Sequence, residues 1–132
     1  MTDAGTILKE ARTIAVVGLS SKPDRDSNSV SRYLQGAGYR VIPVNPREEE
    51  ILGERSYATL AEIPEHVDIV DVFRRAEHTP EVVRAAVEIG AGAVWLQLGI
   101  RSEESRAIAE EAGIAYVEDA CIRTEHRMRG GA

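Results

Sequence analysis

Short apolar runs alternate with longer segments of helical periodicity along the whole chain. Runs of four to eight mostly apolar residues, bounded by glycine or polar residues, are typical of strands buried in a sheet. Such runs predict five strands, at residues 14–17, 39–44, 67–73, 93–98 and 114–117. The third run is interrupted by Asp68 and Asp71, and this alternation predicts a less buried position than that of the first strand.

The segments between these runs carry apolar residues at helical spacing. After the first strand, positions i, i+3, i+4 and i+7 are occupied by Val30, Tyr33, Leu34 and Ala37. Ser27 and Asn28 precede this stripe, and because both residue types are favoured N-caps, the helix is expected to begin near them. Further helices are predicted at residues 79–89 and 102–112, with short helices in the connection at 57–63 and in the tail after Cys121.

Strands that alternate with helices predict an α/β protein. The arrangement that buries both kinds of element is a three-layer α/β/α domain, here with a five-stranded and mainly parallel sheet. The length of 132 residues fits one domain, residues 1–132. Ligands of such sheets bind beyond the carboxyl ends of the strands, where the strand order reverses, so these ends are the candidate site.

Charge and cysteine content exclude several classes of protein. The formal net charge is −6 at pH 7, which argues against nucleic-acid binding because such proteins carry a basic face. Cys121 is the single cysteine, so an internal disulfide and a zinc site built from several cysteines are excluded. The N-terminus lacks the features of a secretory signal, and no apolar run reaches the roughly 20 residues of a membrane span. We therefore expect a cytoplasmic protein without a membrane partner.

The loop after the first strand is the candidate for anion binding. Gly18 allows the backbone to turn sharply there. Glycine at this position is explained either by a ligand that approaches the backbone or by the tight turn alone. The residues that follow carry hydroxyl, amide and cationic groups, and they are Ser20, Ser21, Lys22, Arg25, Ser27 and Asn28. A loop that leads into a helix N-terminus directs free N–H groups at an anion. Residues 18–28 are therefore predicted to bind phosphate, with an ion pair to Asp24 or Asp26 as the alternative role of Arg25.

Two departures from the dinucleotide-binding pattern constrain the type of nucleotide. The loop reads GLSSKP and lacks the second and third glycines of the G-x-G-x-x-G fingerprint. The second strand ends in Asn45 and Pro46, where an NAD-binding unit usually has an acidic residue for the ribose diol. Both departures disfavour a nicotinamide dinucleotide, and an NAD(P)-binding oxidoreductase domain stays the alternative.

Two other strand ends belong to the candidate site by topology alone. The third strand ends with Phe73 and Arg74, and the fourth with Gln97 and Gly99. Phe73 is either a ligand contact or a core residue, whereas Trp95, in mid-strand, is expected in the core. None of the three histidines has a partner at metal-ligand spacing, and no acid–base pair can be placed, so no catalytic site is predicted.

Taken together, these residues resemble a known family. The first part of the resemblance comprises Gly18-Leu19-Ser20, Pro23, Arg25, Ser27, Val30, Tyr33-Leu34, Gly38-Tyr39 and Val44-Asn45-Pro46. It continues in Val72-Phe73-Arg74, Pro80, Trp95-Leu96-Gln97-Leu98-Gly99, Asp119 and Cys121. The chain is similar to the small CoA-binding protein family, which resembles the CoA-binding domain of the succinyl-CoA synthetase alpha subunit and of nucleoside-diphosphate-forming acyl-CoA synthetases.

The resemblance implies a Rossmann-like domain that binds coenzyme A or acyl-CoA and has no established catalysis of its own. It implies that the diphosphate is held by Gly18, Ser20 and the N–H groups near Ser27 and Asn28, with its charge neutralised by Lys22 and Arg25. It also implies that Asn45 and Pro46 lie along the adenosine, and that Val72, Phe73 and Arg74 wall the adenine or pantetheine.

Partners follow from the same resemblance. An enzyme that handles acyl-CoA is the implied protein partner, and a detached CoA-binding subunit of an acyl-CoA ligase is a further alternative. Cys121 is either structural or able to exchange with the thiol of CoA. The oligomeric state is left open.

Overall fold

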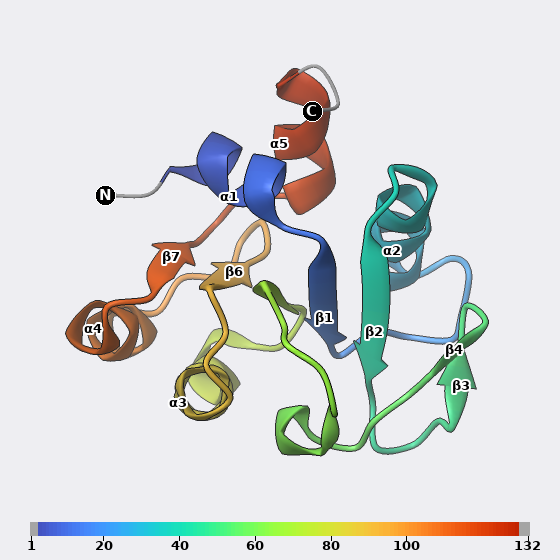
Figure 1. Cartoon of the computed structure of the whole chain (residues 1–132), viewed down its shortest axis with the longest axis horizontal. Coiled ribbons are helices and arrows are strands. Elements are labelled where there is room, and N and C mark those ends of the chain that lie inside the picture. The colour runs from blue at the N-terminus through green and yellow to red at the C-terminus, as the bar shows by residue number, and fades with distance from the viewer. Residues whose placement is uncertain (1–2, 130–132) are drawn as a thin grey trace.

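A five-stranded parallel sheet forms the centre of the protein, as a computed structural model of the chain shows for residues 3–129 (Figure 1). The strands of this sheet are β1 (Thr13–Val17), β2 (Arg40–Val44), β5 (Ile69–Val72), β6 (Ala93–Leu96) and β7 (Ala115–Val117). They lie in the order β2-β1-β5-β6-β7, and every pair of neighbours is parallel. The predicted α/β class and the five-stranded sheet are confirmed.

Helices cover both faces of the sheet. The helices are α1 (Ala4–Glu10), α2 (Asp26–Gly36), α3 (Thr79–Glu88), α4 (Glu103–Ala112) and α5 (Ile122–Met128), with short 3-10 helices η1 (Leu60–Glu62) and η2 (Ala76–His78). One core cluster contains the buried side chains of α3 and α4, and the other contains those of α1, α2 and α5. The fold is therefore the expected three-layer α/β/α arrangement.

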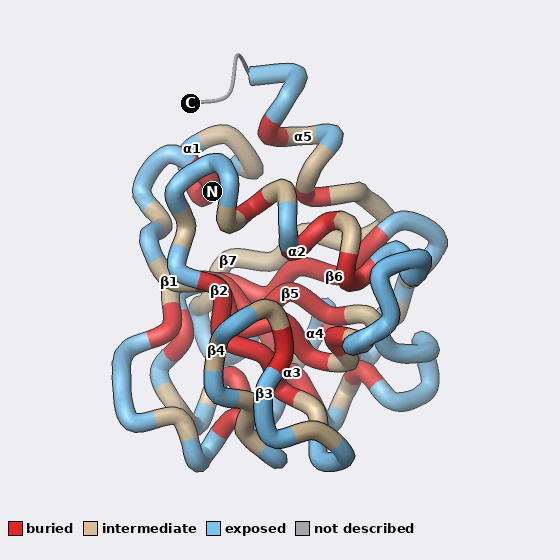
Figure 2. The backbone as a smooth tube through the Cα atoms, turned by 90° about the vertical axis from the view of Figure 1, so that its right-hand side faces the viewer, coloured by how far each residue is buried: buried red, intermediate tan, exposed pale blue. Residues whose placement is uncertain are grey.

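The two core clusters follow from the alternation of side chains along the strands. In β1, Ala15 and Val17 face the helices α3 and α4, whereas Ile14 and Val16 face the opposite helices. All four residues are at most 6 % exposed, and Figure 2 shows the sheet as a buried layer surrounded by exposed loops. Burial on both faces explains the unbroken apolar run of this strand.

The prediction of a less buried third strand is wrong. β5 lies between β1 and β6, and all four of its residues are buried, Asp71 completely. The alternation predicts a less buried strand, but the Asp71 carboxyl accepts a hydrogen bond from Gln97 Nε2 at 2.5 Å inside the protein. Asp68 precedes the strand and accepts hydrogen bonds from the backbone N–H groups of Arg12 and Thr13, at 2.9 and 3.0 Å.

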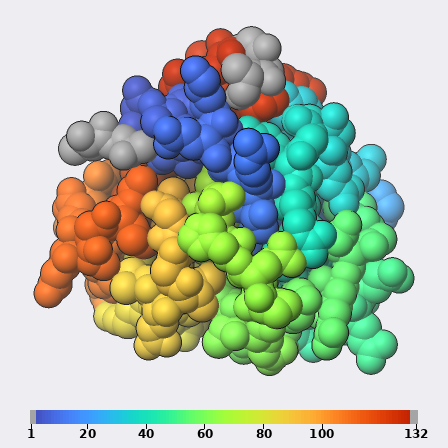
Figure 3. Space-filling view, viewed as in Figure 1, coloured from blue at the N-terminus to red at the C-terminus, as the bar shows by residue number. Residues whose placement is uncertain are grey.

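Trp95 lies in the core, as predicted. Its side chain is completely buried, and its indole N–H donates to the carbonyl of Ala120 at 2.8 Å. This bond fixes the segment that leads into α5. Helices α1 and α5 pack against each other, so the N-terminal and C-terminal segments cover the same end of the molecule (Figure 3).

A small antiparallel hairpin was not predicted. It consists of β3 (Glu50–Ile51) and β4 (Glu54–Arg55), and it lies in the connection between β2 and η1. The short helix expected at residues 57–63 is the 3-10 helix η1. None of the helices within residues 3–129 is long and apolar enough to cross a membrane.

Candidate functional site

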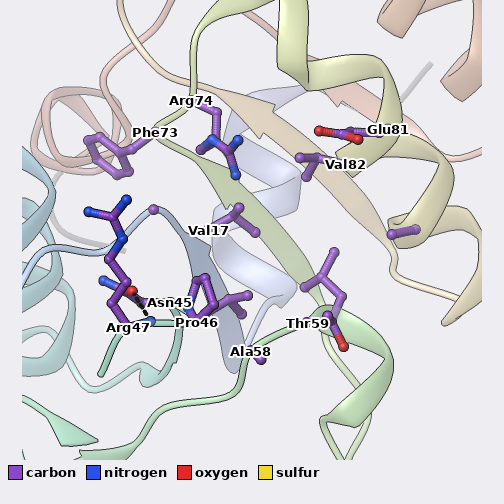
Figure 4. Close-up of a pocket in the computed structure, with 14 residues that line it drawn as sticks. Val17, Asn45, Pro46, Arg47, Ala58, Thr59, Phe73, Arg74, Glu81 and Val82 are labelled. Atoms are coloured by element: carbon purple, nitrogen blue, oxygen red, sulfur yellow. Dashed lines mark hydrogen bonds between the residues drawn. The ribbon is translucent and has the colours of Figure 1, made fainter. Parts of the chain in front are cut away.

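A cleft of about 660 Å³ opens at the carboxyl ends of β1, β2 and β5, where the strand order reverses (Figure 4). The chain passes from β1 through α2 to β2 on one side, and it returns to β5 on the other side of β1. The cleft is lined by Val17, Gly18, Val44, Asn45, Pro46, Arg47, Ala58, Thr59, Leu60, Phe73, Arg74, Glu81, Val82 and Ala85. Topology alone predicts a ligand at this place.

Gly18 lies where β1 meets the backbone of β5. Its φ angle is +87°, and a Cβ atom at this position would lie 2.6 Å from the carbonyl oxygen of Phe73. No side chain fits in that space, and a positive φ disfavours every residue with a Cβ. The backbone turn alone therefore requires glycine at position 18. The ends of β1 and β5 approach each other closely here and form the floor of the cleft.

A second, polar hollow adjoins the cleft on the α2 side. It is lined by Gly18, Ser20, Asp24, Arg25, Asp26, Ser27 and Phe73. Gly18 and Phe73 border both hollows, so they form one crevice with an apolar lobe near α3 and a polar lobe at the start of α2. The sequence predicted the polar lobe, and it missed most of the apolar one.

The predicted N-caps of α2 are wrong. The helix begins at Asp26, Arg25 is the N-cap, and no side chain caps the first turn. Ser27 and Asn28 are instead buried in that turn and bind the loop, since Ser27 Oγ accepts from Ser20 N at 3.0 Å and Asn28 Nδ2 donates to Ser20 O at 2.9 Å. These two side chains shape the loop, and they leave the first N–H groups of the helix without a side-chain acceptor.

The charged residues of this loop are exposed. Arg25 lines the polar lobe and, among residues 3–129, forms no ion pair, so the alternative pairing with Asp24 or Asp26 is wrong. Lys22 is exposed on the same loop but borders neither hollow. Asp24 and Asp26 border the polar lobe as well, so an anion there has two carboxylates nearby.

Asn45 joins the ends of β1 and β2. Its Nδ2 donates to the carbonyl of Leu19 at 2.9 Å, and its Oδ1 accepts from the backbone N–H of Arg47 at 2.8 Å. Both ends of the amide are thus engaged in shaping the strand ends. Pro46, which follows, is exposed and lines the cleft together with Arg47.

Phe73 and Arg74 lie at the centre of the crevice. Phe73 is half-buried, packs against the cluster of α1, α2 and α5, and also lines both lobes, so it is both a core residue and a wall of the site. The Cδ atom of Arg74 is 3.4 Å from the Cβ position at Gly18, so its aliphatic chain crosses the end of β1. In Figure 4 its guanidinium lies between Phe73 and Glu81.

Five of the predicted site residues are engaged elsewhere. Val72 is completely buried in the core. Ser21 donates to Glu48 Oε2 at 3.0 Å, and Asn28 binds the loop as described. Gln97 and Gly99 line neither hollow, and their partners are side chains of neighbouring strand ends.

The partners of Gln97 and Gly99 are Asp71 and Asp119, and the pKa values of these two aspartates are shifted in opposite directions. Burial raises the pKa of the Asp71 carboxyl to about 7, although the hydrogen bond from Gln97 acts in the other direction. Asp119 accepts from the backbone N–H of Gly99 at 2.7 Å and pairs with Arg101, and both contacts hold its pKa below the usual value. Gln97 and Gly99 therefore join strand ends rather than line the crevice.

Sequence reasoning missed several residues of the apolar lobe. Thr59 is the N-cap of η1 and Leu60 its first residue, and Glu81 and Val82 come from the first turns of α3. Residues 79–89 were predicted only as a helix, and the sequence does not show which face of that helix meets the strand ends. Arg47 begins a run of charged residues, 47–50, that carries no site pattern in the sequence, yet it lines the cleft.

Residues 3–129 contain no group of three or more His, Cys, Asp or Glu side chains that could hold a metal ion. His126 is buried and bonded to the hydroxyl of Tyr33 at 2.6 Å. Cys121 is a half-buried free thiol at the N-cap of α5.

Fold and crevice together define a Rossmann-like ligand-binding domain. Its sequence matches the family described as "CoA binding domain" over residues 12–127, so the chain belongs to that family of CoA-binding domains. An uncharacterized protein, YneT, from Bacillus subtilis is 44 % identical over 122 residues, with 92 % of this chain and 90 % of YneT covered.

More distant similarity reaches larger enzymes. The alpha subunit of an ADP-forming acetate–CoA ligase II from Pyrococcus furiosus is 42 % identical over 122 residues, which cover 84 % of this chain and 27 % of that subunit. Among solved structures, a hypothetical protein from Pyrococcus horikoshii OT3 superposes with a TM-score of 0.93 at 40 % identity, covering 97 % of this chain and 92 % of that one. The chain thus spans about a quarter of the ligase subunit and nearly all of its small relatives.

Proposed function

We propose that this protein binds coenzyme A or acyl-CoA in the crevice at the carboxyl ends of β1, β2 and β5, and that it does so without catalysing a reaction on its own. The chain belongs to a family of CoA-binding domains, and the crevice has the position at which sheets of this type bind nucleotides. The observation that carries the proposal is the junction of the two lobes at Gly18, since it joins an apolar surface to a helix N-terminus.

The residues fit such a ligand in their chemistry. The polar lobe offers the cation of Arg25, the hydroxyl of Ser20 and the uncapped N–H groups at the start of α2, which suit a diphosphate. Lys22 adds a positive charge on the same loop. The apolar lobe offers Val17, Leu60, Val82 and Ala85, which suit a flat aromatic base.

Two alternatives remain to be separated by experiment. Similarity to the ligase alpha subunit favours a detached CoA-binding subunit, which would associate with the rest of an acyl-CoA ligase. An NAD(P)-binding oxidoreductase domain has less support, because Asn45 stands at the end of β2 and both ends of its amide are engaged.

The test is calorimetric titration of ligand-stripped protein with CoA. Separate titrations with NAD and with ATP test whether another nucleotide is the ligand. We expect CoA to bind and NAD to give no heat. Arg25→Ala should weaken CoA binding about tenfold, since a charge-assisted hydrogen bond contributes about 1.5–3 kcal/mol. Lys22→Ala should weaken it about threefold, because an exposed cation contributes less.

Lys9→Ala provides the matched control. Lys9 is the only other lysine, and it lies exposed on α1, away from both hollows of the crevice. Its removal should leave CoA affinity unchanged. Heat from NAD with none from CoA would favour the NAD(P)-binding oxidoreductase domain over the CoA-binding domain. CoA binding that appears only after a ligase subunit is added would favour the detached-subunit alternative.

A further inference from the structure

Unpaired arginines gather at the crevice although the whole chain is acidic. The formal net charge is −6, and most arginines of the described chain have a partner in a hydrogen bond, an ion pair or an aromatic stack. Within residues 3–129, no such side-chain partner is found for Arg12, Arg25, Arg47, Arg74 and Arg75. Three of these five line the crevice, namely Arg25, Arg47 and Arg74.

The three cations are divided between the two lobes. Arg25 borders only the polar lobe at the start of α2, whereas Arg47 and Arg74 border only the apolar lobe. Arg47 follows the end of β2 and Arg74 follows the end of β5, and β1 lies between those two strands. In Figure 4 both guanidinium groups lie near Phe73. They therefore offer a second cationic centre, separate from the loop.

One local contact holds each arginine at the cleft. Asn45 Oδ1 accepts from the backbone N–H of Arg47, which holds the turn after β2. The chain of Arg74 crosses Gly18, with Cδ 3.4 Å from the Cβ position there. Arg47 and Arg74 line the same lobe as Val17, Leu60 and Val82, so a nucleotide whose base packs on these apolar side chains has both arginines within the same cavity.

We propose that Arg47 and Arg74 form a second anion subsite, which binds a phosphate monoester on the ribose of the nucleotide and so selects CoA over dephospho-CoA. The inference rests on the proposed function, because it assigns a further phosphate of the same ligand. A guanidinium donates two parallel hydrogen bonds to phosphate oxygens, and the monoester of CoA is the phosphate that a dinucleotide such as NAD lacks.

The experiment compares CoA with dephospho-CoA on each of four proteins by calorimetry. The proteins are the wild type, Arg47→Gln, Arg74→Gln and the control Arg75→Gln, whose exposed side chain follows Arg74 but lines neither lobe. We expect the wild type and the control to bind CoA at least tenfold more tightly than dephospho-CoA. Arg47→Gln should reduce this ratio to about twofold while the affinity for dephospho-CoA stays within a factor of two.

The ratio is measured on one protein at a time, so a partly unfolded variant does not change it. A wild type that binds both ligands equally well would overturn the second subsite and leave the proposed function standing. A tenfold ratio that persists in both Arg47→Gln and Arg74→Gln would overturn it as well. A wild type that binds neither ligand would overturn the proposed function and this inference together.

Discussion

At the scale of single residues, Gly18 determines whether the crevice can form. The backbone turns there with a φ of +87°, and the carbonyl of Phe73 occupies the space that a Cβ atom would need. The same residue borders both the apolar and the polar lobe. A side chain at this position would separate the ends of β1 and β5, and the two lobes would no longer be continuous.

Gly18→Ala is therefore expected to lower both stability and CoA affinity. Strain in the left-handed region costs about 1–2 kcal/mol, and the contact at 2.6 Å adds to it. Chemical denaturation should show a loss of about 2 kcal/mol or more, and calorimetry a loss of CoA binding. Gly36→Ala, at a helical position with nothing within 4 Å, is the control and should be neutral or slightly stabilising. Equal behaviour of the two variants would contradict this role of Gly18.

At the scale of elements, a buried carboxyl joins β5 to the end of β6. Asp71 is completely buried and accepts from Gln97, and its second oxygen has no partner among the described residues. The alternation of aspartates with apolar residues predicted a less buried strand. Burial of an ionised aspartate without a charged partner is unfavourable, yet Asp71 lies in the core. Its pKa of about 7 resolves the conflict, since the carboxyl is largely protonated below that pH. Pattern reasoning cannot foresee this, because the Gln97 contact joins residues 26 positions apart.

The raised pKa of Asp71 predicts a pH-dependent stability. The folded protein keeps this proton up to about pH 7, whereas the unfolded chain loses it near the ordinary value of 3.8. The contribution of Asp71 is thus most favourable below pH 4, and it is lost as the pH rises from about 4 to 7. The full effect is on the order of 4 kcal/mol.

Asp71→Asn removes this titration and keeps the shape of the side chain. Urea denaturation at pH 5 and at pH 8 should show that the variant gains stability relative to wild type at the higher pH. If the free energies of unfolding of the two proteins change in parallel between these pH values, Asp71 is not the group that titrates.

At the scale of the whole molecule, topology brings the site together. The alternating pattern of strands and helices predicted the three layers, and the reversal of strand order between β2 and β5 explains why the loop after β1, Asn45 and Phe73 meet. The sequence could not show the hairpin β3–β4 or the contribution of η1 and α3, because these depend on how distant segments pack. Likewise Arg47, in a run of charges, becomes a site residue only through the neighbouring strand ends.

The prediction was least accurate where side chains have two possible roles. Ser27 and Asn28 were expected to cap α2, and they bind the preceding loop instead. Gln97 was expected at the ligand, and its amide is bonded to Asp71. In each case the residue type and the place along the chain were compatible with both roles, and only the tertiary contact decides between them.

The central claim is that CoA binds at the carboxyl edge of the sheet, and amide chemical-shift mapping by NMR tests it most directly. On addition of CoA to the 14.4 kDa protein, the largest shifts are expected in residues 18–28, 45–47 and 73–74. A smaller hollow at the opposite edge, bordered by Asp68, Gly92 and Gly113, provides the internal reference, and its amides should not move. Shifts that gather at that opposite edge, or no shifts at saturating CoA, would contradict the account.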